Sequence, residues 1–345
     1  MTPKAHEPVG LYDDPSSFDD DAWFMPAPVE SDDLPPLPRA DQRHLFNPAE
    51  WRGAQADLAL ELADLALRFG ALDDRLRGQA VDSHRRLALL EVADLGWWTG
   101  DRIPADRLAQ WHELRLAGVQ EVAQALARAE WAVRRLSGGP APAQGGWTNG
   151  LSAFLGRGQA DGASRGDIAD MAQVMDDCLG LHRITEAAVL FHLWRKLGQG
   201  GPVRETEAAV LAARHAATAG RGGALFLPVA LASGAGLRAG GSVRDVLAAW
   251  LRGAELAVQA ALLHLDRLRD WQRKASNQLD DLQGRVPALL VQLFSDLPTV
   301  SAPLAEARSG ASRAAVQRNL NAMQMRGLIR ETTGQARYRT WTAAL

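Results

Sequence analysis

Apolar residues recur at helical spacing along most of this chain, and that periodicity constrains its fold more than any other feature. The segment ADLALELADLALRFGALDDRL shows it clearly, with apolar positions three or four residues apart at Leu58, Leu62, Leu65, Phe69, Leu72 and Leu76. Such spacing places one apolar stripe along an amphipathic helix. Residues 51–283 contain no useful length of alternating apolar and polar residues. We therefore expect an all-α body.

Further helical segments follow the first one. We expect them at residues 84–98, 105–136, 166–198, 204–219 and 242–283, the last as one helix of about 40 residues with a kink at Gly253. Asp167 is expected to cap the segment 166–198. Trp97 and Trp98 are expected to fill the core at a helix end. Glycines in GRGGALF and ASGAGLRAGG are more typical of tight turns between helices than of a phosphate cradle.

Composition divides the chain into five parts. Residues 1–45 are rich in Pro and Asp and predict a disordered acidic arm. We assign residues 46–136 to an N-terminal helical domain, 137–166 to a Gly/Pro-rich linker or long loop, 167–283 to a second helical region, and 284–345 to a C-terminal domain. Residues 1–50 carry a net charge of −8, and residues 284–345, with eight Arg and three acidic residues, carry +5. Such an asymmetry points to contact with nucleic acid.

Several function classes are disfavoured by what the sequence lacks. No run approaches eighteen uninterrupted apolar residues, and the acidic N-terminus does not resemble a signal peptide, so we expect a soluble, cytoplasmic protein. Cys178 is the only cysteine and is expected to be a small core residue. The common phosphate-binding, metal-binding and acyl-transfer motifs are absent. His182 and His192 would stand about 15 Å apart on a helix, too far to share a metal. We predict no cofactor, no metal and no enzyme activity.

The C-terminal 62 residues predict a winged helix-turn-helix. RVPALLVQLFSD predicts an apolar helix that Pro298 ends. After the short segment APLAEA and the turn RSGAS, SRAAVQRNLNAMQMRG predicts a second helix, capped by Ser312. After Gly327, the strand-like runs 328–331 and 337–341 are joined by a turn and predict a hairpin wing.

The second of these helices has the side chains for reading DNA. Val316, Leu320 and Met323 share one face and would pack on the core. The neighbouring polar face carries residues that can bind base edges or phosphates, as can the hairpin arginines; the candidate DNA-binding residues are Ser312, Arg313, Gln317, Arg318, Asn321, Arg337 and Arg339. The alternative is that these arginines form an ordinary solvated surface and that the unit serves in packing or dimerisation.

The C-terminal residues resemble a known family. The pattern consists of an apolar helix, a Pro-x-Val break at Pro298–Val300, a Ser/Ala-rich turn, and GLIRETTGQARYRTW at residues 327–341. It is similar to that of a bacterial, rhizobial-type family of uncharacterised helix-turn-helix proteins and to the winged helix that ends many Fic-type proteins. The stretch from ALDDRLR to IPADRL also looks like the family's helical N-terminal domain. The resemblance implies a helical body with a C-terminal DNA-binding domain, and no established activity.

Fic enzymes use a His-Pro-Phe-x-Asp/Glu-Gly-Asn-Gly-Arg loop, and HLWRKLGQGG from His192 lacks most of it.

Our hypothesis is a regulator that binds double-stranded DNA as a homodimer, with no membrane contact. The alternative is a non-enzymatic protein-interaction or antitoxin-like module, in which the acidic arm and the body bind a protein partner. An enzyme would need a pocket that joins residues remote in sequence, for instance Asp176, His182 and His192.

Overall fold

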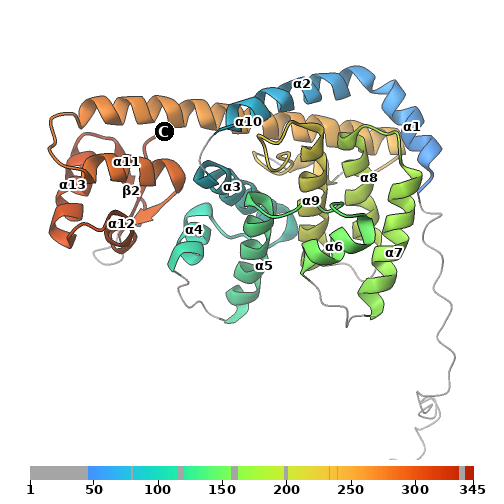
Figure 1. Cartoon of the computed structure of the whole chain (residues 1–345), viewed down its shortest axis with the longest axis horizontal. Helices are drawn as coiled ribbons and strands as arrows, with labels where there is room; N and C mark the ends of the chain where they lie inside the picture. Colours follow the sequence, from blue (N-terminus) through green and yellow to red (C-terminus); the bar gives the residue numbers. More distant parts are fainter. Residues whose placement is uncertain are drawn as a thin grey trace, which may run out of the picture. The chain divides into compact units, whose positions relative to one another are not determined.

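The computed structural model describes residues 46–78, 81–114, 120–156, 162–197, 201–232, 234–238, 240–333 and 339–345. All of them belong to one structural unit, Gln42–Leu345. This part of the chain is mainly helical (Figure 1), which confirms the predicted fold class at that level. The predicted acidic arm, residues 1–45, lies outside the described residues.

The helices of the body are α1 (Pro48–Asp57), α2 (Ala59–Leu76), α3 (Val81–Thr99), α4 (Ala105–Leu114), α5 (Gln120–Ser137), α6 (Trp147–Leu155), α7 (Gly162–Asp177), α8 (Arg183–Lys196), α9 (Pro202–Ala216) and α10 (Val243–Gln278). Two short 3₁₀ helices, η3 (Ala217–Ala219) and η4 (Ala235–Arg238), lie between α9 and α10. The C-terminal elements are α11 (Val286–Asp296), β1 (Val300–Ser301), α12 (Ala302–Ser309), α13 (Arg313–Met325), β2 (Ile329–Glu331) and β3 (Thr340–Ala343).

The centre of the body is the pair α8 and α9, which pack closely on each other (Figure 1). Every residue from Ile184 to Trp194 in α8 is buried, as is every residue from Thr206 to Ala216 in α9. Helices that are covered on all sides belong to the core of a larger protein. Here α1 and α7 pack on α8, and α3 and α5 pack on α9.

Some boundaries differ from the sequence predictions. Residues 137–166, expected to be a linker or a long loop, contain α6 and the start of α7. Asp167 lies inside α7, where its carboxylate accepts a hydrogen bond from Arg204 at 2.8 Å, so it is not the predicted cap. Trp98 packs on Phe191, but Trp97 is 60% exposed beneath the Arg102 guanidinium and does not fill the core.

The long helix α10 begins as predicted, at a capping box. The Ser242 hydroxyl accepts a hydrogen bond from Asp245 N, and the Asp245 carboxylate accepts one from Ser242 N. The helix ends at Gln278, five residues before the predicted end, and it runs through Gly253 without interruption. Gly253 instead allows η4 to approach: a Cβ atom there would lie 2.6 Å from Gly236 N.

We expect Gly253→Ala to lower the free energy of unfolding by about 1–3 kcal/mol, because the added methyl would press on the backbone of Gly236. The matched control is Gly70→Ala in α2, where a Cβ atom meets nothing within 4 Å. That change should raise stability by roughly 0.5–1 kcal/mol through helix propensity. Urea unfolding measures both, and equal effects of the two substitutions would refute the packing role of Gly253.

The glycine-containing segments between α9 and α10 bind carboxylates of the protein itself. Arg221 N and Ala224 N donate to Asp73 of α2, and Val229 N, Ala230 N and Leu231 N donate to Glu91 of α3. A Cβ atom at Gly223 would overlap the Asp73 carbonyl. These amide groups are therefore occupied, and the segments hold the body together, consistent with the expectation that they are not phosphate cradles.

The C-terminal elements form a small unit around a three-stranded antiparallel sheet of order β1-β3-β2. Contacts with α3 and with the end of α10 attach it to the body. The buried Arg86 of α3 donates to the carbonyls of Phe294 and Leu297 at the end of α11. Trp271 of α10 donates to Leu328 O at 2.7 Å, and Arg326 forms an ion pair with Asp281 just beyond α10.

Among the described residues, one helix, α10, is long and apolar enough to cross a membrane by length and composition. Half of the apolar window in this helix is buried inside the protein. The core helix of a soluble protein passes the same test, so this is a weak membrane signal and is compatible with the predicted soluble protein.

Candidate nucleic-acid interface

The second and third helices of the C-terminal unit are joined by a tight turn. α12 ends at Gly310, whose φ of 61° is left-handed and favours glycine. The Ser312 hydroxyl then caps α13 by accepting a hydrogen bond from Ala315 N, as predicted. Below this turn, Val316, Leu320 and Met323 are fully buried, which confirms the predicted core face of α13.

The opposite face of α13 carries the predicted polar residues. Arg313 and Arg318 are exposed, and neither forms an ion pair with a described residue. The Gln317 amide donates a hydrogen bond to Asn321 Oδ1 at 3.0 Å, which orients the two amides along one row of the helix. The geometry thus leaves two free guanidinium groups beside two amide groups on one solvent-facing surface.

In the hairpin, the predicted DNA-binding residue Arg339 is already paired with an acidic side chain. Arg339 donates from Nε to Glu331 Oε2 at 2.8 Å and lies 5.0 Å from the Trp341 ring. Its hydrogen bond, with its positive charge, lowers the pKa of the Glu331 carboxyl. Arg339 can reach a phosphate only by sharing or leaving this partner. Arg337 lies outside the described residues.

Two further arginines of the C-terminal unit were not among the predicted residues, and Arg330 lies toward the body, where it lines a cavity with Asp106 and His264. Arg330 on β2 is exposed and forms no ion pair with a described residue. Successive side chains of a strand point to opposite faces, so the position of Arg330 between Ile329 and Glu331 could have predicted a side chain directed away from the face that carries Ile329. Arg285, the residue before α11, has its guanidinium 4.0 Å from where a Cβ of Gly310 would stand. No local pattern indicates that Arg285 approaches the turn between α12 and α13.

Residues considered for an enzyme are not brought into one pocket. The His182 ring accepts a hydrogen bond from Ile184 N and caps α8, whereas His192 packs near Trp51 and Phe191. Asp176 is exposed on α7. Among the described residues, no three His, Cys, Asp or Glu side chains gather as a metal site. Cys178 is buried, and burial raises its pKa to about 11, which confirms its role as a core residue.

A buried acid–base pair that the sequence did not indicate joins α8 to α9. Glu186 and His215 are each about 2% exposed, and their Oε2 and Nε2 atoms are 2.7 Å apart. Burial opposes ionisation of Glu186, but hydrogen bonds from His215 and Arg183 leave the pKa of its carboxyl below the usual value. The Trp147 ring lies 4.9 Å from the imidazole. The pair is enclosed by the core, and we assign it a structural role.

Comparisons with known proteins add no identification. A scan of the chain against protein-family models finds no match, and a search of curated proteins finds no significant match.

Proposed function

We propose that this chain binds double-stranded DNA through α13 and acts as a transcriptional or plasmid-associated regulator in the cytoplasm. The order α11, β1, α12, α13, β2, β3 with sheet order β1-β3-β2 supports a winged helix-turn-helix, in which the third helix enters the major groove. The family resemblance of residues 284–345 points the same way. We propose no enzymatic role.

One observation carries the proposal: Arg313 and Arg318, which pair with no acid among the described residues, lie beside the amides of Gln317 and Asn321 on the outer face of α13. Guanidinium groups bind phosphates and guanine edges, and amides of this kind bind adenine edges. The buried opposite face of α13 fixes the helix backbone that carries this row, so the backbone need not become ordered on binding.

The charge distribution supports the same partner. Residues 284–345 carry a net +5 in a chain whose total is −3. Other arginines of this unit are already neutralised by acidic side chains of the protein: Arg326 forms an ion pair with Asp281, and Arg339 forms one with Glu331. Arg313 and Arg318, which form no ion pair with a described residue, keep their charge available to phosphates, and such contacts make binding fall steeply as salt concentration rises.

In-vitro selection of bound DNA followed by fluorescence anisotropy tests the proposal. Arg313→Ala and Arg318→Ala should each weaken binding to all sequences and reduce the salt slope by about one. Gln317→Ala should weaken binding to the selected site by roughly 5- to 100-fold, with little effect on random DNA. The matched control is Arg252→Ala, an exposed arginine of α10. The proposal is wrong if the protein does not bind DNA at low salt, or if Arg252→Ala lowers the DNA affinity as much as the α13 substitutions do.

A homodimer is part of this proposal. α2 and α10 run side by side, joined by the ion pairs Arg68–Glu255 and Arg75–Asp266. Leucines that are about half exposed or more recur at seven-residue spacing on each helix: Leu60 and Leu67 on α2, and Leu256 and Leu263 on α10. An apolar row of this kind fits a second copy of the chain. A palindromic selected site would support the dimer.

The second candidate function is a non-enzymatic protein-interaction or antitoxin-like module. The same exposed leucines favour it, because they would equally suit a different protein, with the acidic arm as a further contact. Co-purification of a stoichiometric protein partner without DNA binding would select this function over the first.

A further inference from the structure

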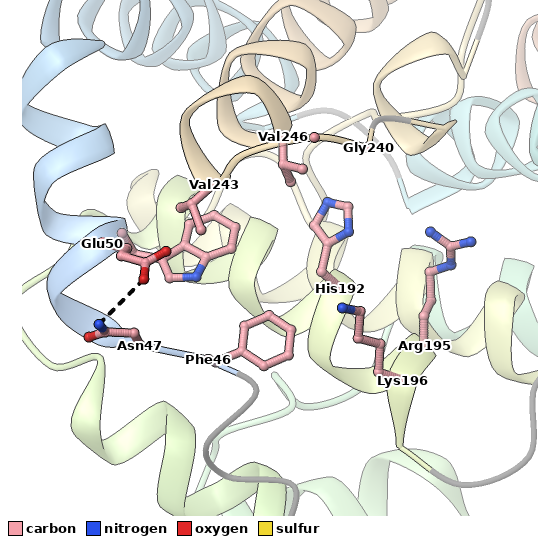
Figure 2. Close-up of a pocket in the computed structure, with 11 residues that line it drawn as sticks. Phe46, Asn47, Glu50, His192, Arg195, Lys196, Gly240, Val243 and Val246 are labelled. Atoms are coloured by element: carbon pink, nitrogen blue, oxygen red, sulfur yellow. Dashed lines mark hydrogen bonds between the residues drawn. The ribbon is translucent and has the colours of Figure 1, made fainter.

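A cavity of about 380 Å³ lies between α1, α8 and the start of α10, away from the proposed DNA-binding face. Its volume is within the range of roughly 300–1,000 Å³ that is usual for small-molecule sites. Figure 2 shows side chains from all three helices turned toward this space. The site is formed by the body alone, so an inference about it goes beyond the proposed function.

One wall of the cavity is aromatic and the facing wall is aliphatic. The rings of Phe46 and Trp51 are stacked, with centroids 6.5 Å apart and planes inclined by 18°. Val243 and Val246 of the first turn of α10 line the cavity on the side opposite Phe46 (Figure 2). Two apolar walls that face each other suit a flat, apolar body.

The floor of the cavity carries a buried polar atom without a partner. His192 is 9% exposed, and its Nε2 atom is buried and bonds to nothing in the described residues. Burial, followed by the charges of Arg195 and Lys196, lowers the pKa of this imidazole to about 4. The ring is neutral at pH 7 and can donate or accept one hydrogen bond, and an unused group of this kind is costly unless a ligand or water meets it.

One cation is available to a ligand here. The Lys196 ammonium lies 5.9 Å from the Phe46 ring, turned back beneath His192 (Figure 2), and forms no ion pair with a described residue. Arg195 is engaged elsewhere, since its guanidinium faces Trp98 and Phe191 and lies 3.6 Å from Glu205. Glu50 at the rim adds a negative charge. One free cation beside one carboxylate favours a monoanion over a dianion.

The start of α10 does not supply the anion contact. Its capping box already uses the Ser242 hydroxyl and the Asp245 carboxylate, and the latter adds negative charge at the helix end. Recognition of an anion therefore depends on Lys196.

We propose that this cavity binds a small aromatic carboxylate, with its ring between the Phe46–Trp51 wall and the Val243–Val246 wall, its carboxylate paired with Lys196, and a polar atom bonded to His192. The aromatic body supplies the buried area, and the single negative charge selects the ligand over neutral analogues.

Isothermal titration of the full chain at pH 7 with benzoate and its neutral analogue benzamide tests the proposal. Benzoate should bind saturably to one site, at least about tenfold tighter than benzamide. Lys196→Gln should weaken benzoate binding by roughly tenfold or more and change benzamide binding by less than about twofold. The control is Lys274→Gln, which removes an exposed lysine of α10 far from the cavity in sequence and should change the binding of neither benzoate nor benzamide.

A second variant tests the location. Val246→Phe fills the space between the two walls and should abolish binding of both probes while the thermal unfolding midpoint stays close to that of the wild type. The proposal is overturned if benzoate shows no saturable binding, if it binds no tighter than benzamide, or if Lys196→Gln or Val246→Phe binds it as the wild type does.

Discussion

Replacing Arg86 by Met should lower the free energy of unfolding by about 3–5 kcal/mol. The guanidinium is buried and donates from Nη1 to Phe294 O at 3.0 Å and to Leu297 O at 2.6 Å, and from Nε to His264 Nε2 at 2.9 Å. Burial lowers the pKa of Arg86 to about 10, so the group stays charged at pH 7. Met fills a similar volume but leaves two carbonyls at the end of α11 without donors.

Urea unfolding followed by circular dichroism measures this loss. Arg252→Met is the matched control, because that arginine is exposed on α10 and should change stability by less than about 0.5 kcal/mol. A loss below about 1 kcal/mol for Arg86→Met would contradict the view that this side chain attaches the C-terminal unit to α3.

The second large effect concerns Glu91, whose carboxylate organises the segment before α10. Its Oε1 atom accepts from Val229 N and Ala230 N at 2.8 Å, and Oε2 accepts from Leu231 N at 2.9 Å. Glu91→Leu removes the acceptors of three buried amide groups and should lower the free energy of unfolding by about 3–5 kcal/mol. The control is Glu61→Leu on the exposed side of α2, expected within about 0.5 kcal/mol of the wild type.

Glu91 also predicts a pH dependence. Burial raises its pKa to about 7, against an ordinary value of 4.5, even though the three amide bonds act in the opposite direction. Because the folded protein holds this proton more tightly than the unfolded chain, stability from this group is present below pH 4.5 and is lost as pH rises to 7.

The comparison with Glu91→Gln, which cannot ionise, isolates that effect. The stability of the wild type relative to this variant should fall by about 3 kcal/mol between pH 4.5 and pH 8, since one pKa unit corresponds to about 1.4 kcal/mol. Urea unfolding at the two pH values measures it. A difference that stays constant with pH would show that Glu91 is ionised throughout this range.

Much of the secondary structure follows from local patterns in the sequence. The apolar stripe from Leu58 to Leu76 is buried as its spacing predicts, and Ser242 and Ser312 cap the helices that they precede. The buried face of α13 was also predictable, because three apolar residues at helical spacing mark it. Each of these features depends on residues within a few turns of one another, where periodicity and capping chemistry act directly.

The candidate DNA-binding face could be placed on α13 from the sequence, but the state of its charges could not. Within the part of the chain that the structure describes, Arg313 and Arg318 find no acidic partner, whereas Arg339 is held by Glu331 across the hairpin. Which arginine finds an acid depends on strand register, which the sequence alone left open over the short runs 328–331 and 337–341.

The sequence by itself determined the all-α body, the apolar faces of α2 and α13 and the cap of α13, because these depend on neighbours along the chain. Only the tertiary structure decided that Arg86 meets the end of α11, that Glu91 binds a segment 138 to 140 residues away, and that His192 and Lys196 share a cavity with α10. Polar side chains of this kind carry no periodic signal. Their partners are set by which helices pack together, and that choice depends on the shapes of whole faces rather than on any local pattern.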